Sequence, residues 1–134
     1  VRDAKYIMGS DEDAQIAVDL VLAFAKKDTE TMRKSMGDTV RYAPPQGGKM
    51  ITSLSTEIPD VVKMLHEPYD SLKRTVWNAV PLKSTASDFT RVTVAFKEDR
   101  FYKDGKKESV RLVDRIFIRQ KKIFRIHQWI AEME

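Results

Sequence analysis

The spacing of the apolar residues changes once along this chain, and that change limits the possible folds more than any other feature. Before Ser71, apolar side chains recur at helical intervals, as in the series Ile16, Leu20 and Phe24. After Ser71, apolar and polar residues alternate over residues 72–82, 89–102, 107–120 and 123–133. Because short loops separate these four segments, they should form an antiparallel meander. The sequence therefore predicts an α+β fold in which N-terminal helices pack on a curved antiparallel sheet.

Three helices can be placed in the first half of the chain from their end signals. Ser10 and Asp28 are suitable N-caps for the first two helices, and Gly37 is expected to stop the second. Thr56 can cap the third, which Pro68 should end. We therefore expect short helices that present one apolar stripe each to the sheet.

Composition and charge exclude several classes of protein. The 134 residues suit one domain over positions 1–134. The sequence contains no cysteine, and no apolar run approaches the ~20 residues of a membrane span. The net charge of +4 is scattered among acidic residues, so nucleic acid is an unlikely partner. No cofactor or metal motif is readable, and none is expected.

The cellular location of the protein stays open. The chain begins with Val1 instead of an initiator Met, which fits a removed signal peptide or simple trimming. A soluble and exported protein is therefore one expectation, with no sequence feature that decides it.

Loop lengths predict the register of the last three strands. A three-residue loop over 103–105, with Gly105 in the left-handed conformation, would place Val94 opposite Asp114 and so align the apolar rows. A second three-residue loop over 120–122 would place Asp114 opposite Gln128. A two-residue loop would break that match unless a bulge restored it.

This register divides the sheet into two faces. The first face is apolar except at Asn78, Asp114 and Gln128. Its expected members are Val76, Asn78, Val80, Val92, Val94, Phe96, Leu112, Asp114, Ile116, Phe124, Ile126 and Gln128. The same alternation puts Arg74, Glu98 and Arg100 on this face, where we expect them to reach the rim and solvent. The opposite face is mixed, and it carries the large side chains of Trp77, Phe117, His127 and Trp129.

The chain resembles the nuclear-transport-factor-two-like superfamily, in particular its SnoaL-like and ketosteroid-isomerase-like members. The resemblance lies in the order of helices and strands, in the stretch "RYAPPQGG" after the second helix, and in the ending "RQKKIFRIHQWI". In that ending, residues 120–123 occupy the place of a turn often spelled Asp-Gly-Lys-Ile. The resemblance implies a cystatin-like, cone-shaped α+β barrel in which the concave sheet face lines a pocket.

The resemblance also implies where a site and an interface would lie. A small hydrophobic or aromatic molecule is the expected ligand, and the expected pocket residues are Tyr42, Asn78, Val94, Phe96, Asp114, Ile116, Ile126 and Gln128. Members of the superfamily often form homodimers through the outer sheet faces. The residues expected at such a dimer face are Trp77, Phe117, His127 and Trp129.

Asp114 is the candidate catalytic residue, because a carboxylate among Val and Ile side chains must be paired or protonated. An ionised Asp114 could act as a base, and a neutral one could donate a hydrogen bond to an oxyanion. The alternative is a structural role, with Asp114 paired to Arg74 or hydrogen-bonded to Gln128 and Asn78. The favoured function is a small-molecule-binding domain. An isomerase, dehydratase or polyketide cyclase that uses Asp114, and a protein-interaction scaffold, remain open.

Overall fold

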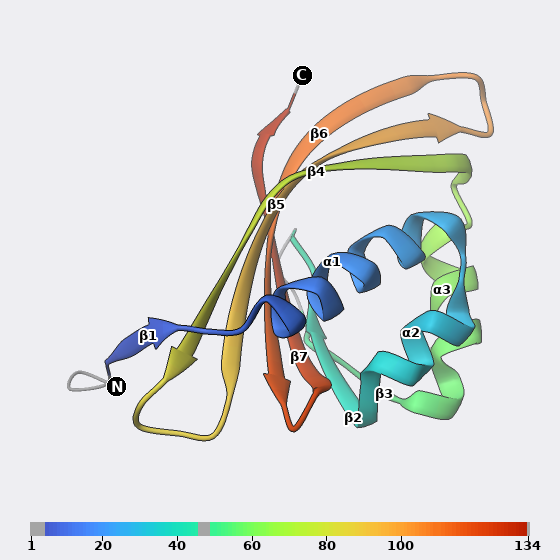
Figure 1. The fold of residues 1–134 in the computed structure, drawn as a ribbon. Helices are drawn as coiled ribbons and strands as arrows, with labels where there is room; N and C mark the ends of the chain where they lie inside the picture. The colour runs from blue at the N-terminus through green and yellow to red at the C-terminus, as the bar shows by residue number, and fades with distance from the viewer. Residues whose placement is uncertain (1–4, 46–48, 134) are drawn as a thin grey trace.

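The structure, a computed structural model, describes residues 5–45 and 49–133, and in these it contains three α-helices on one side of a curved sheet (Figure 1). The helices are α1 (Asp11–Lys26), α2 (Thr29–Ser35) and α3 (Ile58–His66), the last preceded by a 3-10 turn over Ser55–Glu57. The strands are β1 (Tyr6–Met8), β2 (Met36–Ala43), β3 (Ile51–Leu54), β4 (Tyr69–Ser84), β5 (Thr90–Tyr102), β6 (Lys107–Arg119) and β7 (Lys122–Met133). The α+β layout predicted from the sequence is confirmed.

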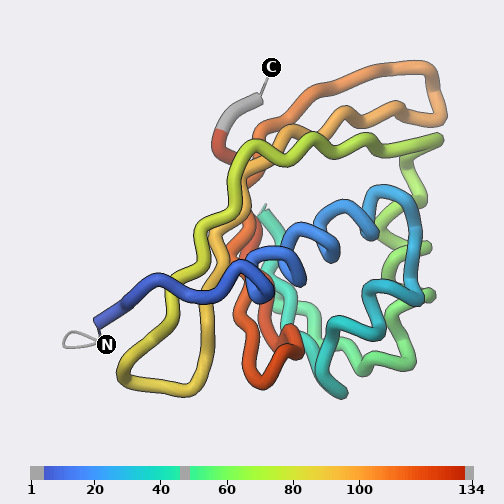
Figure 2. The backbone as a smooth tube through the Cα atoms, in the orientation of Figure 1, coloured from blue at the N-terminus to red at the C-terminus, as the bar shows by residue number. Residues whose placement is uncertain are grey.

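The described strands form one sheet in the order β1-β4-β5-β6-β7-β2-β3. Neighbouring strands are antiparallel except for β2 and β7, which pair in parallel with Tyr42 beside Ile126. The sheet bends strongly along its long strands, so that β4, β5 and β6 reach over the helices at one end (Figure 2). Strands β1 and β3 were not predicted, since three or four residues carry too little alternation to be recognised.

The helix starts are partly as the sequence predicts. The Ser10 hydroxyl accepts a hydrogen bond from the Asp13 amide at 3.1 Å, and the Asp28 carboxylate accepts one from the Thr31 amide at 3.2 Å, so both N-caps are confirmed. Helix α2 ends at Ser35, two residues before Gly37, which instead belongs to β2. Thr56 lies inside the 3-10 turn, so its predicted role as the cap of α3 is wrong. The last three residues of the stretch "RYAPPQGG", positions 46–48, lie outside the described residues.

The β5–β6 hairpin has the predicted register. The Tyr102 amide donates to the Lys106 carbonyl at 2.9 Å, and Gly105 has a φ of 91°, which suits a residue without a Cβ. Val94 therefore pairs with Asp114, and Phe96 pairs with Leu112.

The β6–β7 hairpin follows the alternative with a bulge. Its loop has two residues, Gln120 and Lys121, with φ of 51° and 65°, and Arg119 pairs with Lys122. The register then shifts near Phe124, which restores the pairing of Asp114 with Gln128. The predicted loop over 120–122 is therefore wrong, although the match that it was meant to explain is confirmed.

Two bulges exchange side chains between the faces. One at Phe124 moves its ring to the outer face, 6.1 Å from the ring of Phe117, while Ile123 is fully buried, so the predicted place of Phe124 on the inner face is wrong. The other lies at Trp77, because Val76 pairs with Phe96 whereas Asn78 pairs with Ala95. Asn78 and Val80 are consequently exposed on the outer face, so their predicted places on the inner face are wrong.

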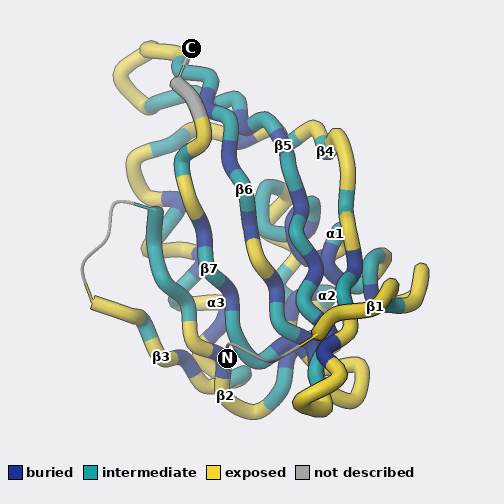
Figure 3. The backbone as a smooth tube through the Cα atoms, turned by 90° about the vertical axis from the view of Figure 1, so that its left-hand side faces the viewer, coloured by how far each residue is buried: buried dark blue, intermediate teal, exposed yellow. Residues whose placement is uncertain are grey.

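The core lies between the inner sheet face and the helices. On β5 and β6, buried residues alternate with more exposed ones, and Figure 3 shows this alternation from the outer side. The fully buried sheet residues include Val92, Val94, Phe96 and Ile116, and Ala17 and Val21 of α1 pack against the same core. At ~25 cal/mol per Å² of apolar surface buried, this layer dominates the stability of the fold.

Candidate ligand-binding site

A cavity of about 190 Å³ lies between the inner sheet face and the three helices. Most of its wall is apolar and comes from all three helices and from β2, β3, β4 and β7. The apolar lining residues include Leu20, Val21, Phe24, Met32, Met36, Val40, Ile51, Ile58, Val61, Val62, Leu65, Leu72 and Ile126. The polar lining residues are Tyr42, Ser53, Tyr69, Arg74, Glu98, Arg100, Asp114 and Gln128. An apolar wall with a few polar groups is the usual composition of a small-molecule site.

The predicted pocket residues divide into three groups. Tyr42, Asp114, Ile126 and Gln128 line the cavity. Val94, Phe96 and Ile116 are buried on the same face but belong to the packed core, and they are not among its lining residues. Asn78 lies on the opposite face because of the bulge at Trp77, so its assignment to the pocket is wrong.

Asp114 is the most unusual group in the cavity wall. Its side chain is buried, and its Oδ1 atom has no hydrogen-bond partner among the described residues. Burial raises the pKa of the Asp114 carboxyl to about 6, while Arg74 and a hydrogen bond with Gln128 act in the opposite direction. The carboxyl is therefore mostly ionised at neutral pH and can take up a proton in mildly acidic conditions.

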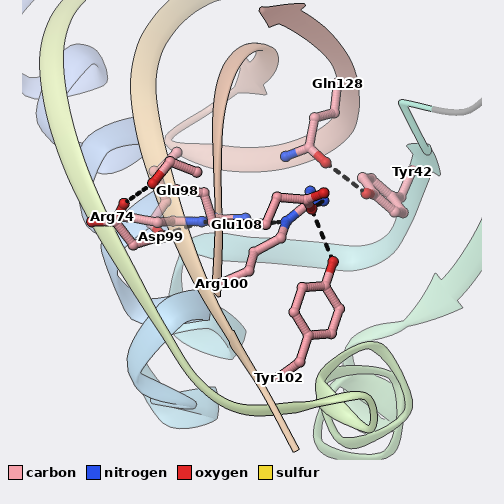
Figure 4. Close-up of polar contacts among 10 residues, drawn as sticks. Tyr42, Arg74, Glu98, Asp99, Arg100, Tyr102, Glu108 and Gln128 are labelled. Atoms are coloured by element: carbon pink, nitrogen blue, oxygen red, sulfur yellow. Dashed lines mark hydrogen bonds and ion pairs between the residues drawn. The ribbon is translucent and has the colours of Figure 1, made fainter. Parts of the chain in front are cut away.

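Tyr42 and Gln128 form a polar pair next to Asp114. The Tyr42 hydroxyl donates a hydrogen bond to Oε1 of Gln128 at 3.0 Å, and Figure 4 shows the two side chains pointing toward one another. This bond leaves the Gln128 amide nitrogen to face the Asp114 carboxyl. Burial and the nearby Asp114 raise the pKa of Tyr42, so its phenol stays protonated. The parallel pairing of β2 with β7 brings the two residues together.

A buried ion network occupies the other polar side of the cavity. Arg74 Nε lies 2.7 Å from Glu98 Oε2, and Arg100 Nε lies 2.7 Å from Glu98 Oε1. Burial raises the pKa of Glu98, but the two guanidinium groups outweigh it, so the pKa lies below its ordinary value. The prediction that these three residues reach solvent is wrong, because the side chains of Arg74, Glu98 and Arg100 are only 6%, 4% and 10% exposed.

Further contacts hold this network to the surrounding structure. Arg74 Nη1 donates to the Val21 carbonyl at 2.9 Å, and its guanidinium lies 4.5 Å from the centre of the Phe24 ring. Arg100 Nη1 contacts Glu108 at 3.0 Å, and the Tyr102 hydroxyl donates to the same carboxylate (Figure 4). The alternation of β5 places Glu98 and Arg100 on the inner face, so the sequence contained a signal for their direction. The sequence contained no signal for how deeply the two side chains are buried.

His66 is buried near the cavity without lining it. Its Nε2 lies 2.7 Å from the Phe24 carbonyl and must carry the proton, while Nδ1 has no partner among the described residues. Burial lowers the pKa of His66, so the ring is neutral. Within residues 5–45 and 49–133, the structure brings no three His, Asp or Glu side chains into a metal-binding group. No helix of the described chain is both long and apolar enough to cross a bilayer.

Comparisons with known proteins support the fold. No family model matches the chain, and no curated protein matches it significantly in sequence. Solved structures match it well. An NTF2-like protein of unknown function from Burkholderia pseudomallei superposes with a TM-score of 0.73 at 11% identity, covering 91% of this chain and 92% of that one. This chain has the NTF2-like fold.

Two other NTF2-like structures show how varied the neighbours are. An epoxide hydrolase of the LEH-like type from M. tuberculosis gives a TM-score of 0.68 at 9% identity, over 90% of this chain and 83% of that one. A protein with a ketosteroid isomerase-like fold from Catenulispora acidiphila, in complex with trimethylamine, gives a TM-score of 0.68 at 14% identity. The match covers 86% of this chain and 84% of that one. Since these identities show the fold alone, function must be argued from the site.

The outer face of this NTF2-like sheet carries the four residues predicted for a dimer face. Trp77 is 49% exposed and Trp129 is 42% exposed. The His127 ring lies between those of Phe117 and Trp129, at 5.9 and 5.7 Å, and its Nε2 accepts a hydrogen bond from Arg125. Burial, together with Arg125 and Arg115, lowers the pKa of His127, so this histidine is a neutral part of an aromatic surface.

Proposed function

We propose that this protein is a small-molecule-binding domain whose ligand occupies the cavity with an apolar body and one polar end. The observation that carries the proposal is the buried Asp114, whose Oδ1 atom lacks a partner in the wall of an otherwise apolar cavity. Burying a polar atom without a partner costs ~1–3 kcal/mol. A ligand that hydrogen-bonds Oδ1 would recover that cost.

The size of the cavity limits the ligand. An apolar cavity of ~150 Å³ holds benzene, whereas drug-sized ligands need ~300 Å³ or more. The cavity of about 190 Å³ therefore fits a compound of one ring or a short chain. A steroid or a polyketide would require the helices to move away from the sheet.

Toluene tests the cavity independently of any polar group. In ¹H–¹⁵N spectra, titration with toluene should shift the amides of Val21, Tyr42 and Ile126. The variant Val62→Phe, which fills the cavity from α3, should abolish these shifts. The matched variant Val80→Phe, on the exposed outer face, should leave them unchanged. Shifts confined to surface residues, or equal shifts in both variants, would refute the proposal.

The second candidate function is an enzyme that uses Asp114 as an acid or base. The specific support is the Asp114 pKa of about 6, which suits proton transfer near neutral pH, with the hydrogen-bonded pair Tyr42 and Gln128 in the same cavity wall. The other buried acid of the wall, Glu98, is held by two arginines and is not free to act as a base. Because the described wall offers one carboxyl that is free to act, binding is the better-supported function.

Proton exchange separates the two functions. An enzyme of the isomerase type would move an α-proton of a small ketone such as cyclohexanone to Asp114 and return a deuteron from D₂O. Deuterium incorporation that is fast with the native protein and lost in Asp114→Asn would establish catalysis. Equal rates for the two proteins would leave binding as the function.

We also propose that two copies associate through the outer sheet face. The support is the exposed Trp77 and Trp129, each covered on one side by the guanidinium of Arg111 or Arg115 at 5.1 Å. Such exposed apolar area is typical of an interface.

A pure scaffold, by contrast, would need no open cavity, and the cavity is an argument against that function.

A further inference from the structure

The chemistry of the cavity wall places a specific demand on the ligand, provided that the proposed function holds. Asp114 is the lining residue whose buried side-chain atom, Oδ1, has no partner within the described part of the chain. An ionised carboxylate only accepts hydrogen bonds. A ligand that satisfies this atom at neutral pH must therefore supply an N–H or O–H group.

The other acid of the wall, Glu98, and the Tyr42 phenol already have partners. Both carboxylate oxygens of Glu98 accept from arginines, at 2.7 Å each, and the Tyr42 hydroxyl donates to Gln128. These groups hold one another in place, so the ligand has no need to satisfy them. Among the buried side-chain atoms of the described wall, Oδ1 of Asp114 is thus the one acceptor left without a hydrogen bond.

The charges around Asp114 favour a cationic donor over an anion. The positive charges of Arg74 and Arg100 are balanced by the negative charges of Glu98 and Glu108, with which the arginines form ion pairs. The Asp114 carboxylate is an additional negative charge in the same wall, in a medium where charges interact strongly. A ligand ammonium would offset it, whereas a ligand carboxylate would be repelled.

We infer that the cavity takes a small primary amine of about one ring in size, whose ammonium group donates to Oδ1 of Asp114. Alcohols of the same size bind more weakly, because they bring a donor but no positive charge to offset the Asp114 carboxylate in the low-dielectric wall. Ethers and carboxylates of that size bind worst, since they offer Oδ1 no donor.

Four probes with one ring each test this inference: benzylamine, benzyl alcohol, anisole and benzoate. Their dissociation constants are measured by NMR titration at about pH 7.5, where Asp114 is ionised. Benzylamine should bind at least tenfold tighter than anisole, with benzyl alcohol between them and benzoate weakest. In Asp114→Asn, which keeps an acceptor oxygen but loses the charge, benzylamine should lose its advantage over benzyl alcohol.

The pH dependence gives an independent readout. Below pH 6 the affinity for benzylamine should fall toward tenfold per pH unit, because protonation of Asp114 removes the acceptor while the amine stays charged. The affinity for toluene should not change. Thermal unfolding of Asp114→Asn confirms that the variant is folded.

The outcomes distinguish the inference from the function on which it rests. If toluene binds in the cavity but anisole or benzoate binds as tightly as benzylamine, the amine preference is wrong and the binding function stands. If toluene and all four probes fail to bind, both are wrong. Benzylamine binding that survives unchanged in Asp114→Asn also overturns the inference.

Discussion

Arg74 and Glu98 form an ion pair across the β4–β5 ladder, with Arg74 Nε 2.7 Å from Glu98 Oε2 and side chains only 6% and 4% exposed. Arg100 holds the other oxygen of the same carboxylate. Charges this deep are expensive to remove from water, and they are tolerated because each is paired. The pair therefore supports the polar wall of the cavity while contributing little net stability of its own.

Replacing one partner of this pair should be strongly destabilising. Arg74→Met leaves Glu98 with one cation and should lower the free energy of unfolding by about 3–5 kcal/mol, as measured by urea denaturation. Lys97→Met on the outer side of β5 is the matched control. Lys97 is more exposed and lies 3.8 Å from Asp99, so its loss should cost less than about 1 kcal/mol. Similar losses of stability for the two variants would show that breaking the buried ion pair is no more destabilising than breaking a more exposed one.

The buried Asp114 should make the protein less stable as pH rises through the range between about 4 and 6. Its pKa is raised from 3.8 to about 6 in the folded state, so there the unfolded chain releases its proton first. The stabilisation is complete below pH 3.8 and is lost above pH 6. At 1.36 kcal/mol per pKa unit, the loss is about 3 kcal/mol.

Asp114→Asn isolates this contribution. The difference in unfolding free energy between Asp114→Asn and the native protein should grow in favour of the variant from pH 4 to pH 6 and then stay constant. Glu98 remains paired in both proteins, so its titration cancels in the difference. A difference that is independent of pH would mean that Asp114 titrates normally.

The hydroxyl of Tyr42 should control the environment of Asp114 through Gln128. Tyr42→Phe removes the donor to Gln128 Oε1 and should cost about 1 kcal/mol of stability. Because Gln128 then loses its anchor, its hydrogen bond to Asp114 weakens, and the Asp114 pKa should rise further above 6. Carboxyl ¹³C NMR titration of Asp114 measures this shift. An unchanged Asp114 pKa would show that Gln128 is held by its strand alone.

The outer face gives a direct test of self-association. Trp129→Arg places a charge where an apolar ring is 42% exposed, and it should weaken a dimer at least tenfold in sedimentation experiments. Met64→Arg, on the exposed side of α3, alters a 53% exposed apolar residue away from the sheet and should have no effect. A native protein that sediments as a 15.5 kDa monomer would refute the proposed dimer.

The sequence predicts the face of the sheet and the pairing partner for some residues but not for others. Alternation over long strands gave the inner direction of Asp114, and loop length gave its pairing with Val94. Bulges are invisible to alternation, because an extra residue such as Trp77 moves every later side chain to the other face until the strand ends. Asn78 was misplaced for that reason alone.

Depth within the molecule was harder to predict than direction. Arg74 and Glu98 are charged residues of the kind usually found at a solvent-exposed rim. They are buried only because the sheet bends over α1. The parallel pairing of β2 with β7, which completes the site by bringing Tyr42 to Gln128, joins segments 86 residues apart and left no local pattern. Site residues that depend on long-range contacts are therefore the ones that sequence reasoning misses.

The loop between β6 and β7 can be improved, because its two residues have conformations that suit Asn and Gly. Gln120 and Lys121 have φ of 51° and 65°, and in a two-residue hairpin loop the pair Asn-Gly is preferred. Gln120→Asn should therefore raise the free energy of unfolding by about 0.5 kcal/mol in urea denaturation.

Lys121→Gly serves as the comparison for this loop, because it removes backbone strain and an interaction at once. Lys121 Nζ lies 3.2 Å from the Asp13 carboxylate and 3.6 Å from that of Glu12, so the glycine loses contacts that join the loop to α1. Because Lys121 is half exposed, solvent screens these ion pairs, and the net change should be close to zero. Adding Asp13→Asn to both proteins should then restore a gain for the glycine variant. A glycine variant that is destabilised by more than about 1 kcal/mol with or without Asp13 would show that relief of backbone strain at Lys121 contributes little to the stability of the hairpin.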